Sequence, residues 1–187
     1  MKNYFVKITL SFTLLFLSAY CIISFVITGA LDLFQACTTS ISAGSAFSWL
    51  YAKVLWRINP LEKTPRLLQY YQCTLKYSHE KGIGQKIAGV KIDQTLFHVR
   101  LNFATEEIFS YSTAAQFVEM HGIVFFEYQY GTVPDALYME KNPKQDGAAK
   151  LRVQTSGRLF KADLLKGNYW TTSCTRGSIV FEPTSAK

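Results

Sequence analysis

The stretch Thr95–Phe103, TLFHVRLNF, alternates between apolar and polar residues. Its apolar positions fall on one side and its polar positions on the other: Phe97, Val99, Leu101 and Phe103 against His98, Arg100 and Asn102. A period of two is typical of a β-strand with one face on a core and one in solvent. The stretch therefore predicts a half-buried strand.

Further strands are predicted on both sides of it. Tyr70–Tyr77 alternates in the same way, with Tyr71, Cys73, Leu75 and Tyr77 on one side, and Leu151–Thr155 does so over a shorter length. Gly122–Gly131, GIVFFEYQYG, is rich in β-branched and aromatic residues and reads as a well-buried strand. Tyr169–Cys174 and Ser178–Phe181 indicate a closing hairpin or a bulged strand.

One segment between these strands is predicted to be helical. Thr105 can cap its start, and Glu106 and Glu107 suit the positive end of the helix dipole. Apolar residues then recur at three- and four-residue steps up to Gly122: Ile108, Tyr111, Ala115 and Val118. With loops at 79–84 and 142–149, the fold class is α+β, an antiparallel sheet or partly open barrel with one packed helix.

The N-terminal region is strongly apolar. Ile8–Leu31 contains 24 uncharged residues, which as a helix would span about 36 Å, enough for a hydrocarbon core of about 30 Å. A cleaved signal peptide is the alternative, but its apolar region usually runs about 7–15 residues. The run therefore predicts a transmembrane signal-anchor.

Charge sets the expected orientation. Lys2 and Lys7 precede the span and Asp32 follows it, so the N-terminus is expected in the cytoplasm. The expected organisation is a tail at 1–7, a span at 8–31, a juxtamembrane segment at 32–59 and an extracytoplasmic α+β domain at 60–187. This places the chain in the cell inner membrane as a single-pass protein with a periplasmic domain.

A second, weaker apolar stretch leaves another topology open. Residues 41–56 carry apolar positions at helical spacing, diluted by serines and Lys53. We interpret them as an amphipathic helix at the membrane surface, because hydroxyls and a lysine make a transmembrane helix costly. The alternative is a two-span hairpin that leaves the domain in the cytoplasm.

The four cysteines predict one disulfide. Cys73 lies on an early predicted strand and Cys174 near the last one, so a bond between them would tie the ends of an extracytoplasmic domain together. Cys21 lies inside the predicted span, and Cys37 is left unpaired, where it could link two copies into a homo-oligomer.

No residue pattern predicts catalysis. The three histidines, His79, His98 and His121, lack the spacing of a metal site or a nucleophile partner. We therefore expect no catalytic, cofactor-binding or metal-binding residues, no cofactor and no enzymatic activity. A membrane-anchored envelope hydrolase that uses His79 or His121 is kept as the alternative.

Charge is unevenly distributed along the domain. Residues 101–140 contain six acidic and no basic residues, whereas residues 141–187 contain nine basic and three acidic ones. Two interpretations stay open: neighbouring strands neutralise one another, or an acidic and aromatic face docks a partner. The residues expected on such a face are Glu106, Glu107, Glu119, Glu127, Tyr128 and Tyr130.

These observations together predict a function class. Nucleic acid is not expected as a partner despite the sequence pI of about 9.2, because the basic residues form no compact cluster. We expect a membrane-tethered, non-enzymatic interaction domain with the membrane and other envelope proteins as partners. In layout it resembles a subunit or accessory factor of an assembly for secretion, conjugation, immunity or exclusion.

Overall fold

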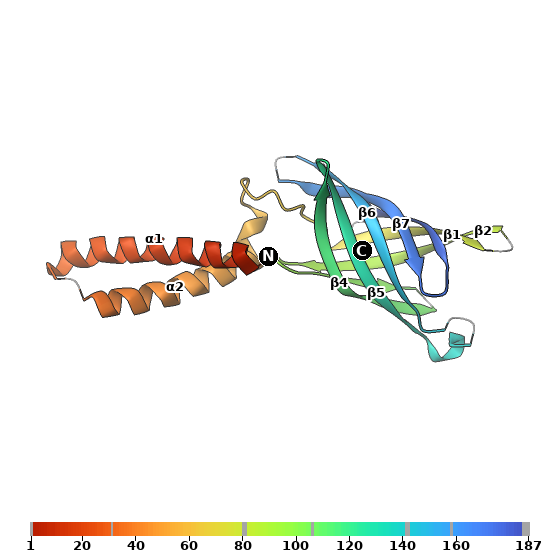
Figure 1. The fold of residues 1–187 in the computed structure, drawn as a ribbon, viewed down its shortest axis with the longest axis horizontal. Coiled ribbons are helices and arrows are strands. Elements are labelled where there is room, and N and C mark those ends of the chain that lie inside the picture. Colours follow the sequence, from red (N-terminus) through yellow and green to blue (C-terminus); the bar gives the residue numbers. More distant parts are fainter. Residues whose placement is uncertain are drawn as a thin grey trace. The chain divides into compact units, whose positions relative to one another are not determined.

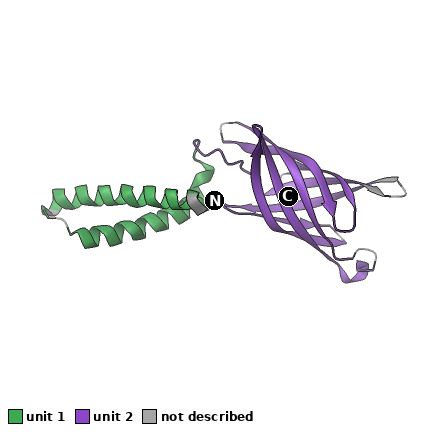
Figure 2. Ribbon diagram, viewed as in Figure 1, with its two compact units in different colours: residues 1–59 green, residues 60–187 purple. Residues whose placement is uncertain are grey.

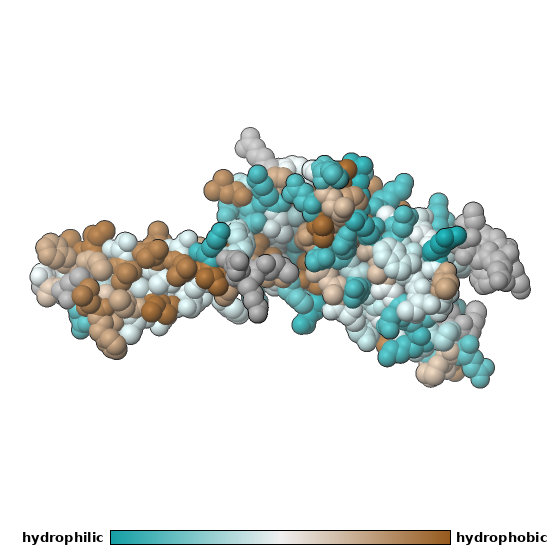
Figure 3. Space-filling model, viewed as in Figure 1, coloured by the Kyte–Doolittle hydropathy of each residue, from teal (hydrophilic) through white to brown (hydrophobic). Residues whose placement is uncertain are grey.

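The computed structural model describes residues 2–30, 32–79, 82–105, 107–140, 143–157 and 159–184. It divides the chain into two compact units, residues 1–59 and residues 60–187 (Figure 2). Apolar side chains dominate the surface of the first unit, whereas polar side chains are much more frequent on the second (Figure 3).

The first unit is a helical hairpin made of α1 (Lys2–Thr28) and α2 (Leu33–Lys53). Gly29, with φ at +65°, ends α1 in the left-handed conformation that glycine adopts without a steric penalty. Asp32 then caps α2, because its Oδ1 accepts a hydrogen bond of 3.1 Å from the Gln35 N–H. The short link makes the two helices antiparallel neighbours (Figure 1).

Small residues form the face of α2 that is buried. They recur at every fourth position: Ala36, Ser40, Gly44, Ser48 and Ala52. A Cβ at Gly44 would lie 2.5 Å from the Thr13 Oγ1 of α1, so the backbones approach too closely for a larger residue. The predicted helix at 41–56 is therefore corrected in two respects. It runs from Leu33 to Lys53, and its buried face consists of small residues.

One of the described helices is long and apolar enough to cross a membrane. This candidate span is Tyr4–Ile27 within α1, close to the predicted run at 8–31. The assignment follows from the length and the composition of this helix.

The second unit is a closed barrel of eight antiparallel strands that follow one another in sequence order (Figure 1). The strands are β1 (Tyr70–His79), β2 (Gly82–Gln94), β3 (Val99–Ala104), β4 (Ile108–Met120), β5 (Ile123–Pro134), β6 (Asp146–Ser156), β7 (Lys161–Thr171) and β8 (Arg176–Pro183). β8 pairs with β1 and closes the barrel, so the first and last of the described strands have no free edge. Two short 3₁₀ helices, Leu55–Arg57 and Ala136–Tyr138, lie outside the strands.

The helix predicted after Thr105 is wrong, because these residues form β4. A β-bulge between Ser112 and Ala114 breaks the two-residue alternation of this strand. Its register against β5 places Ser112 and Ala115 on the same face as the inward-facing Tyr130 and Tyr128. Tyr111 and Val118 pair with Gly131 and Phe125 and lie on the other face, so the apolar spacing that predicted a helix came from residues on both faces of the strand.

The first strands of the barrel also differ from the prediction. Thr95–His98 is a turn, in which the Thr95 N–H donates to the His98 carbonyl at 2.8 Å, so β3 begins only at Val99. β2 begins at Gly82, inside the segment predicted as a loop, and β6 likewise begins at Asp146. Glycine-rich strand starts carry the same residues as turns, which explains both errors.

The chain segment before β1 covers one end of the barrel. The Leu67 N–H donates to Gln94 Oε1 and Gln94 Nε2 donates to the Pro65 carbonyl, both at 2.8 Å. The buried Tyr71 hydroxyl donates to the Ala162 carbonyl at 2.8 Å. A continuous core of inward-facing residues, including Leu101, Phe126, Leu151 and Phe181, fills the barrel from this end.

Candidate ligand-binding pocket in the barrel

A pocket of about 480 Å³ lies at the opposite end of the barrel. This size falls within the roughly 300–1,000 Å³ that small-molecule sites occupy. Four inward-facing tyrosines line it, Tyr77 from β1, Tyr128 and Tyr130 from β5, and Tyr169 from β7, and Tyr111 from β4 is a fifth lining tyrosine. We call Tyr77, Tyr128 and Tyr169 the floor tyrosines, since they lie at one level and Tyr130 is two residues nearer the strand end.

The alternation of each strand explains why these rings face inward. Tyr77 follows the inward-facing Tyr71, Cys73 and Leu75 at two-residue steps. Tyr128 follows Phe126, and their rings stack with centroids 5.6 Å apart. The centroid of the Tyr130 ring lies 5.8 Å from that of Tyr128, so β5 carries a continuous aromatic column from the core into the pocket.

Burial keeps the pocket hydroxyls protonated. It raises the pKa of Tyr128 well above the ordinary value of 10, and it also raises the pKa of Tyr130 and Tyr169. At neutral pH these side chains therefore carry no charge. They offer flat aromatic faces together with O–H groups that can donate to an anionic or carbonyl oxygen.

Hydroxyl side chains form the wall of the pocket above the floor tyrosines: Ser110, Ser112, Thr132, Thr171 and Thr175. The Thr132 hydroxyl is engaged, because it accepts from the Gln145 N–H at 2.8 Å and donates to the Gln145 carbonyl at 3.0 Å. The Thr171 Oγ1 is different: it is buried and has no hydrogen-bond partner among the described residues. A buried polar atom without a partner is rare and costly, and Thr171 belongs to the lining of the pocket.

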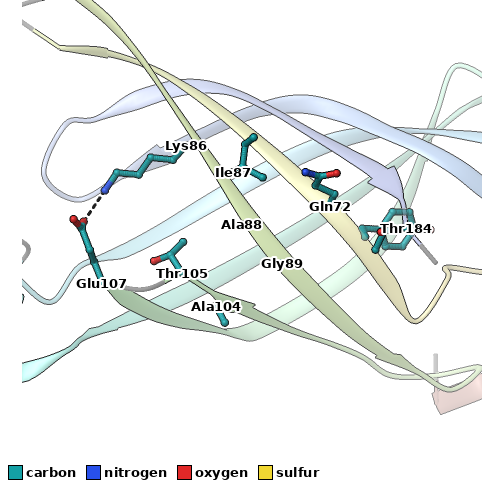
Figure 4. Close-up of a pocket in the computed structure, with 10 residues that line it drawn as sticks. Gln72, Lys86, Ile87, Ala88, Gly89, Ala104, Thr105, Glu107 and Thr184 are labelled. Atoms are coloured by element: carbon teal, nitrogen blue, oxygen red, sulfur yellow. Dashed lines mark hydrogen bonds and ion pairs between the residues drawn. The ribbon is translucent and has the colours of Figure 1, made fainter. Parts of the chain in front are cut away.

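One ion pair lies at the rim. Lys86 Nζ of β2 is 2.8 Å from Glu107 Oε2, just before β4, and Figure 4 shows the two side chains pointing toward one another. β3 ends at Ala104, so this pair spans a part of the wall that β3 does not reach. On the outer side lies a hollow of about 830 Å³ that shares Lys86, Thr105 and Glu107 with the pocket.

The residues predicted to form a partner-binding face are not brought together. Tyr128 and Tyr130 face the barrel interior, whereas Glu127 between them faces out and pairs with Lys150 of β6 at 2.8 Å. Glu119 is exposed near the far end of β4, Glu107 lies at the pocket rim, and Glu106 lies outside the described residues. The Glu127–Lys150 pair supports the interpretation in which neighbouring strands neutralise one another.

The predicted disulfide is not formed in the structure. Cys73 is a fully buried free thiol opposite Phe181 of β8, and Cys174 is an exposed free thiol in the link between β7 and β8. Gly177 is the paired residue of β8 nearest to Cys174, and it lies opposite Tyr77 of β1. Tyr77 is four residues from Cys73, which is about 13 Å along the strand at ~3.3 Å per residue. This separation exceeds the Cα distance that a disulfide allows.

Most of the pocket residues were absent from the sequence-based site. Tyr77 was assigned correctly to the inward face of a strand. Its neighbours in the pocket, however, belong to strands near the C-terminal end of the domain sequence. Tyr169 is brought to it only because β8 lies between β1 and β7 in the closed barrel. Thr171 and Lys86 carry no sequence signal for a site.

Fold and pocket together define a small β-barrel with a pocket of small-molecule size at one end of its interior. Comparison with known families gives a specific match: residues 62–182 match the model of "Cap15, cyclic dinucleotide receptor domain". A curated relative, CD-NTase-associated protein 15 of Staphylococcus schleiferi, is 32% identical over 184 residues, which covers 95% of this chain and 94% of the relative. The chain therefore belongs to the Cap15 cyclic dinucleotide receptor domain family.

This assignment corrects the functional prediction. The family is one of receptor domains for a small molecule, so the prediction of a subunit or accessory factor of an envelope assembly is wrong. The error has a physical origin. No contiguous motif marks the pocket in the sequence, because it is built from single tyrosines and hydroxyls on separate strands.

Proposed function

We propose that this chain is a membrane-anchored receptor that binds a cyclic dinucleotide in the barrel pocket. The observation that carries the proposal is the tyrosine-floored pocket, which lies inside the region matched by the receptor-domain family. A cyclic dinucleotide presents two planar bases and two phosphates. Bases stack on aromatic side chains, so the floor tyrosines and Tyr130 supply suitable surfaces.

The phosphates need hydrogen-bond donors and positive charge. Neutral hydroxyls such as Thr171 can donate to phosphate oxygens, and protonated tyrosines add no repulsion. Lys86 is the one cation among the described residues that line the pocket. A ligand phosphate would compete with Glu107 for its ammonium group.

We further propose that the chain binds its ligand without converting it. Of the described residues that line the pocket, none is a histidine or a cysteine, and Glu107 is the sole carboxylate. That carboxylate forms an ion pair with Lys86. Prolonged incubation should therefore return a cyclic dinucleotide intact, which chromatography of the released ligand would check.

For the membrane, we infer a hairpin in which both helices insert and the barrel stays in the cytoplasm. Three hydroxyls of α2 bond within the helix, which lowers the cost of a second span: Ser48 donates to the Gly44 carbonyl at 2.6 Å, Ser42 to the Thr38 carbonyl at 2.9 Å and Thr38 to the Phe34 carbonyl at 3.0 Å. The buried Ser40 hydroxyl has no hydrogen-bond partner among the described residues. Lys53 ends α2, where its side chain can reach the interface. A doubly charged ligand cannot cross a bilayer, so a cytoplasmic receptor meets a ligand made from cytoplasmic nucleotides.

Topology can be tested with reporters fused after Lys187. The hairpin predicts a fluorescent-protein fusion that glows and an alkaline phosphatase fusion without activity. Active alkaline phosphatase would contradict the hairpin and favour a single span.

Ligand binding can be tested with the full-length protein in detergent micelles. Calorimetric titration with cyclic diadenylate and cyclic diguanylate should show saturable binding of one ligand per chain for at least one of them. Tyr130→Leu should weaken binding, whereas Trp170→Leu on the outer wall should not, since Trp170 does not line the pocket. No saturable binding of either ligand, or equal loss in both variants, would contradict the proposal.

A further inference from the structure

Tyrosines and small residues alternate around the barrel at the level of the pocket floor. Residues directly opposite one another in antiparallel pairs have side chains on the same face. Followed across six strands, the inward positions of this level are Gly84, Tyr77, Gly177, Tyr169, Ala149 and Tyr128. Each floor tyrosine therefore has a small residue opposite it on a neighbouring strand.

The tyrosine rings occupy the space that the glycines leave. A Cβ at Gly84 would lie 2.6 Å from both Cε2 and Oη of Tyr77, and a Cβ at Gly177 would lie 2.8 Å from Tyr169 Cε1. Real Cβ contacts essentially never fall below 3.0 Å. The distal half of each ring must therefore lie across its glycine, close to the wall.

Tyr130 repeats the arrangement one level nearer the end of the barrel. Gly147 of β6 is its directly opposite residue, and a Cβ there would lie 2.5 Å from Tyr130 Cζ. Tyr77, Tyr130 and Tyr169 thus each lie over a glycine on an adjacent strand.

We infer that Gly84, Gly147 and Gly177 are positioning residues, which hold the tyrosine rings flat against the wall so that ring faces and an open slot are presented to a nucleobase. This inference rests on the proposed function, because it assigns the rings to the bases of the ligand. Alternation of large and small residues also fills the interior of small barrels. Filling alone does not explain the arrangement, since a pocket of about 480 Å³ remains beside these rings.

Gly84 allows the sharpest test of the three. The three heavy atoms nearest to its missing Cβ all belong to the Tyr77 ring, whereas a Cβ at Gly177 also meets the Lys76 carbonyl. Gly84→Ala must therefore push a flexible ring toward the pocket and leave the backbone in place. Gly89→Ala on the same strand is the matched control, because no atom lies within 4 Å of its Cβ position.

The experiment titrates cyclic diadenylate and cyclic diguanylate into the full-length protein and both variants in micelles. Gly84→Ala should bind about tenfold more weakly, in the range of one lost base–aromatic contact, while Gly89→Ala should match the wild type. Equal binding by Gly84→Ala and wild type would overturn the inference and leave the proposed function standing. Absence of binding by the wild type itself would instead overturn the proposed function, and the assignment of bases to the rings with it.

A second measurement tests the ring placement without ligand. Protons above an aromatic ring are shifted upfield, so the Gly84 Hα signals should lie upfield and return toward ordinary values in Tyr77→Leu. An ordinary shift in the wild type would overturn the inference even if the ligand binds. An upfield shift that Tyr77→Leu removes, combined with the tenfold loss in Gly84→Ala, supports it.

Discussion

Lys86 Nζ lies 2.8 Å from Glu107 Oε2 at the rim of the barrel pocket. The pair joins β2 to the residue before β4, beyond the end of β3 at Ala104. Its two side chains are 43% and 25% exposed, so it contributes little to stability. The one cation among the described lining residues therefore already has an acidic partner. Under the proposed function, a ligand phosphate has to displace that partner.

Removing the charge of Glu107 should strengthen ligand binding. Glu107→Gln frees the Lys86 ammonium group and removes a repulsive carboxylate, so affinity for a cyclic dinucleotide should rise about three- to tenfold. Lys86→Met should weaken it. The free energy of unfolding should change by less than about 1 kcal/mol in either variant. Calorimetric titration and urea unfolding would measure both quantities.

Glu127→Gln is the matched control for this prediction. Glu127 makes an ion pair of the same length with Lys150, but on the outer wall. Its substitution should leave ligand affinity unchanged. A similar gain in both glutamine variants would indicate a general charge effect and contradict the role of the rim pair.

Thr171→Val should raise stability and lower affinity at the same time. The buried Thr171 Oγ1 has no hydrogen-bond partner among the described residues, so an isosteric methyl group should raise the free energy of unfolding by about 1 kcal/mol. Binding should weaken about fivefold, because a donor to the ligand is lost. In contrast, Thr132→Val should destabilise the fold, since it removes the two hydrogen bonds that the Thr132 hydroxyl makes with the Gln145 backbone. A loss of stability in Thr171→Val would contradict the assignment.

The barrel should lose stability at high pH. Burial raises the pKa of Tyr71 to about 12, against about 10 in an unfolded chain. Between pH 10 and 12 the unfolded chain releases this proton while the folded chain retains it, so the free energy of unfolding falls by about 1.4 kcal/mol per pH unit for each such tyrosine. Below pH 10 this contribution is constant.

Urea unfolding between pH 8 and pH 12 would measure the slope. Tyr71→Phe should be less stable at pH 8, because it loses the hydrogen bond to the Ala162 carbonyl, and its stability should fall less steeply above pH 10. Identical slopes in the two proteins would show that Tyr71 titrates at an ordinary pKa.

All four cysteines should react with a thiol reagent in denatured protein that has not been reduced. In the folded protein Cys174 should react readily, whereas Cys73 should react slowly, because burial raises its pKa and blocks access. Mass spectrometry of labelled peptides would count the modified residues. If Cys73 and Cys174 were spared together in the denatured sample, a disulfide would exist and the free-thiol assignment would fail.

Local alternation made part of the barrel predictable. Tyr70–Tyr77 keeps a strict alternation and Gly122–Gly131 is rich in β-branched and aromatic residues, and the structure has β1 and β5 at these places. The bulge at Ser112/Ala114 breaks the alternation of β4, and its apolar residues lie on both faces, so β4 resembled a helix. Closure of the sheet depends on pairing between β1 and β8, which no local pattern encodes.

The site was less predictable than the fold for the same reason. Tyr77 and Tyr169 become neighbours only across Gly177 in the closed barrel. A tyrosine on a core face has the same pattern whether it fills the core or lines a pocket. The partner surface was predicted from sequence proximity, which fails along β5 because Glu127 and Tyr128 point to opposite faces.

The most direct test of the central claim is photocrosslinking of an azido-substituted cyclic dinucleotide to the full-length protein, followed by peptide mapping. The account predicts that labelling is confined to strand segments around the pocket, above all those carrying Tyr130 and Tyr169, and that unmodified cyclic dinucleotide competes it away. Labelling confined to the outer hollow around Gln72 and Ile87, or to α1 and α2, would contradict the claim that the barrel pocket is the receptor site.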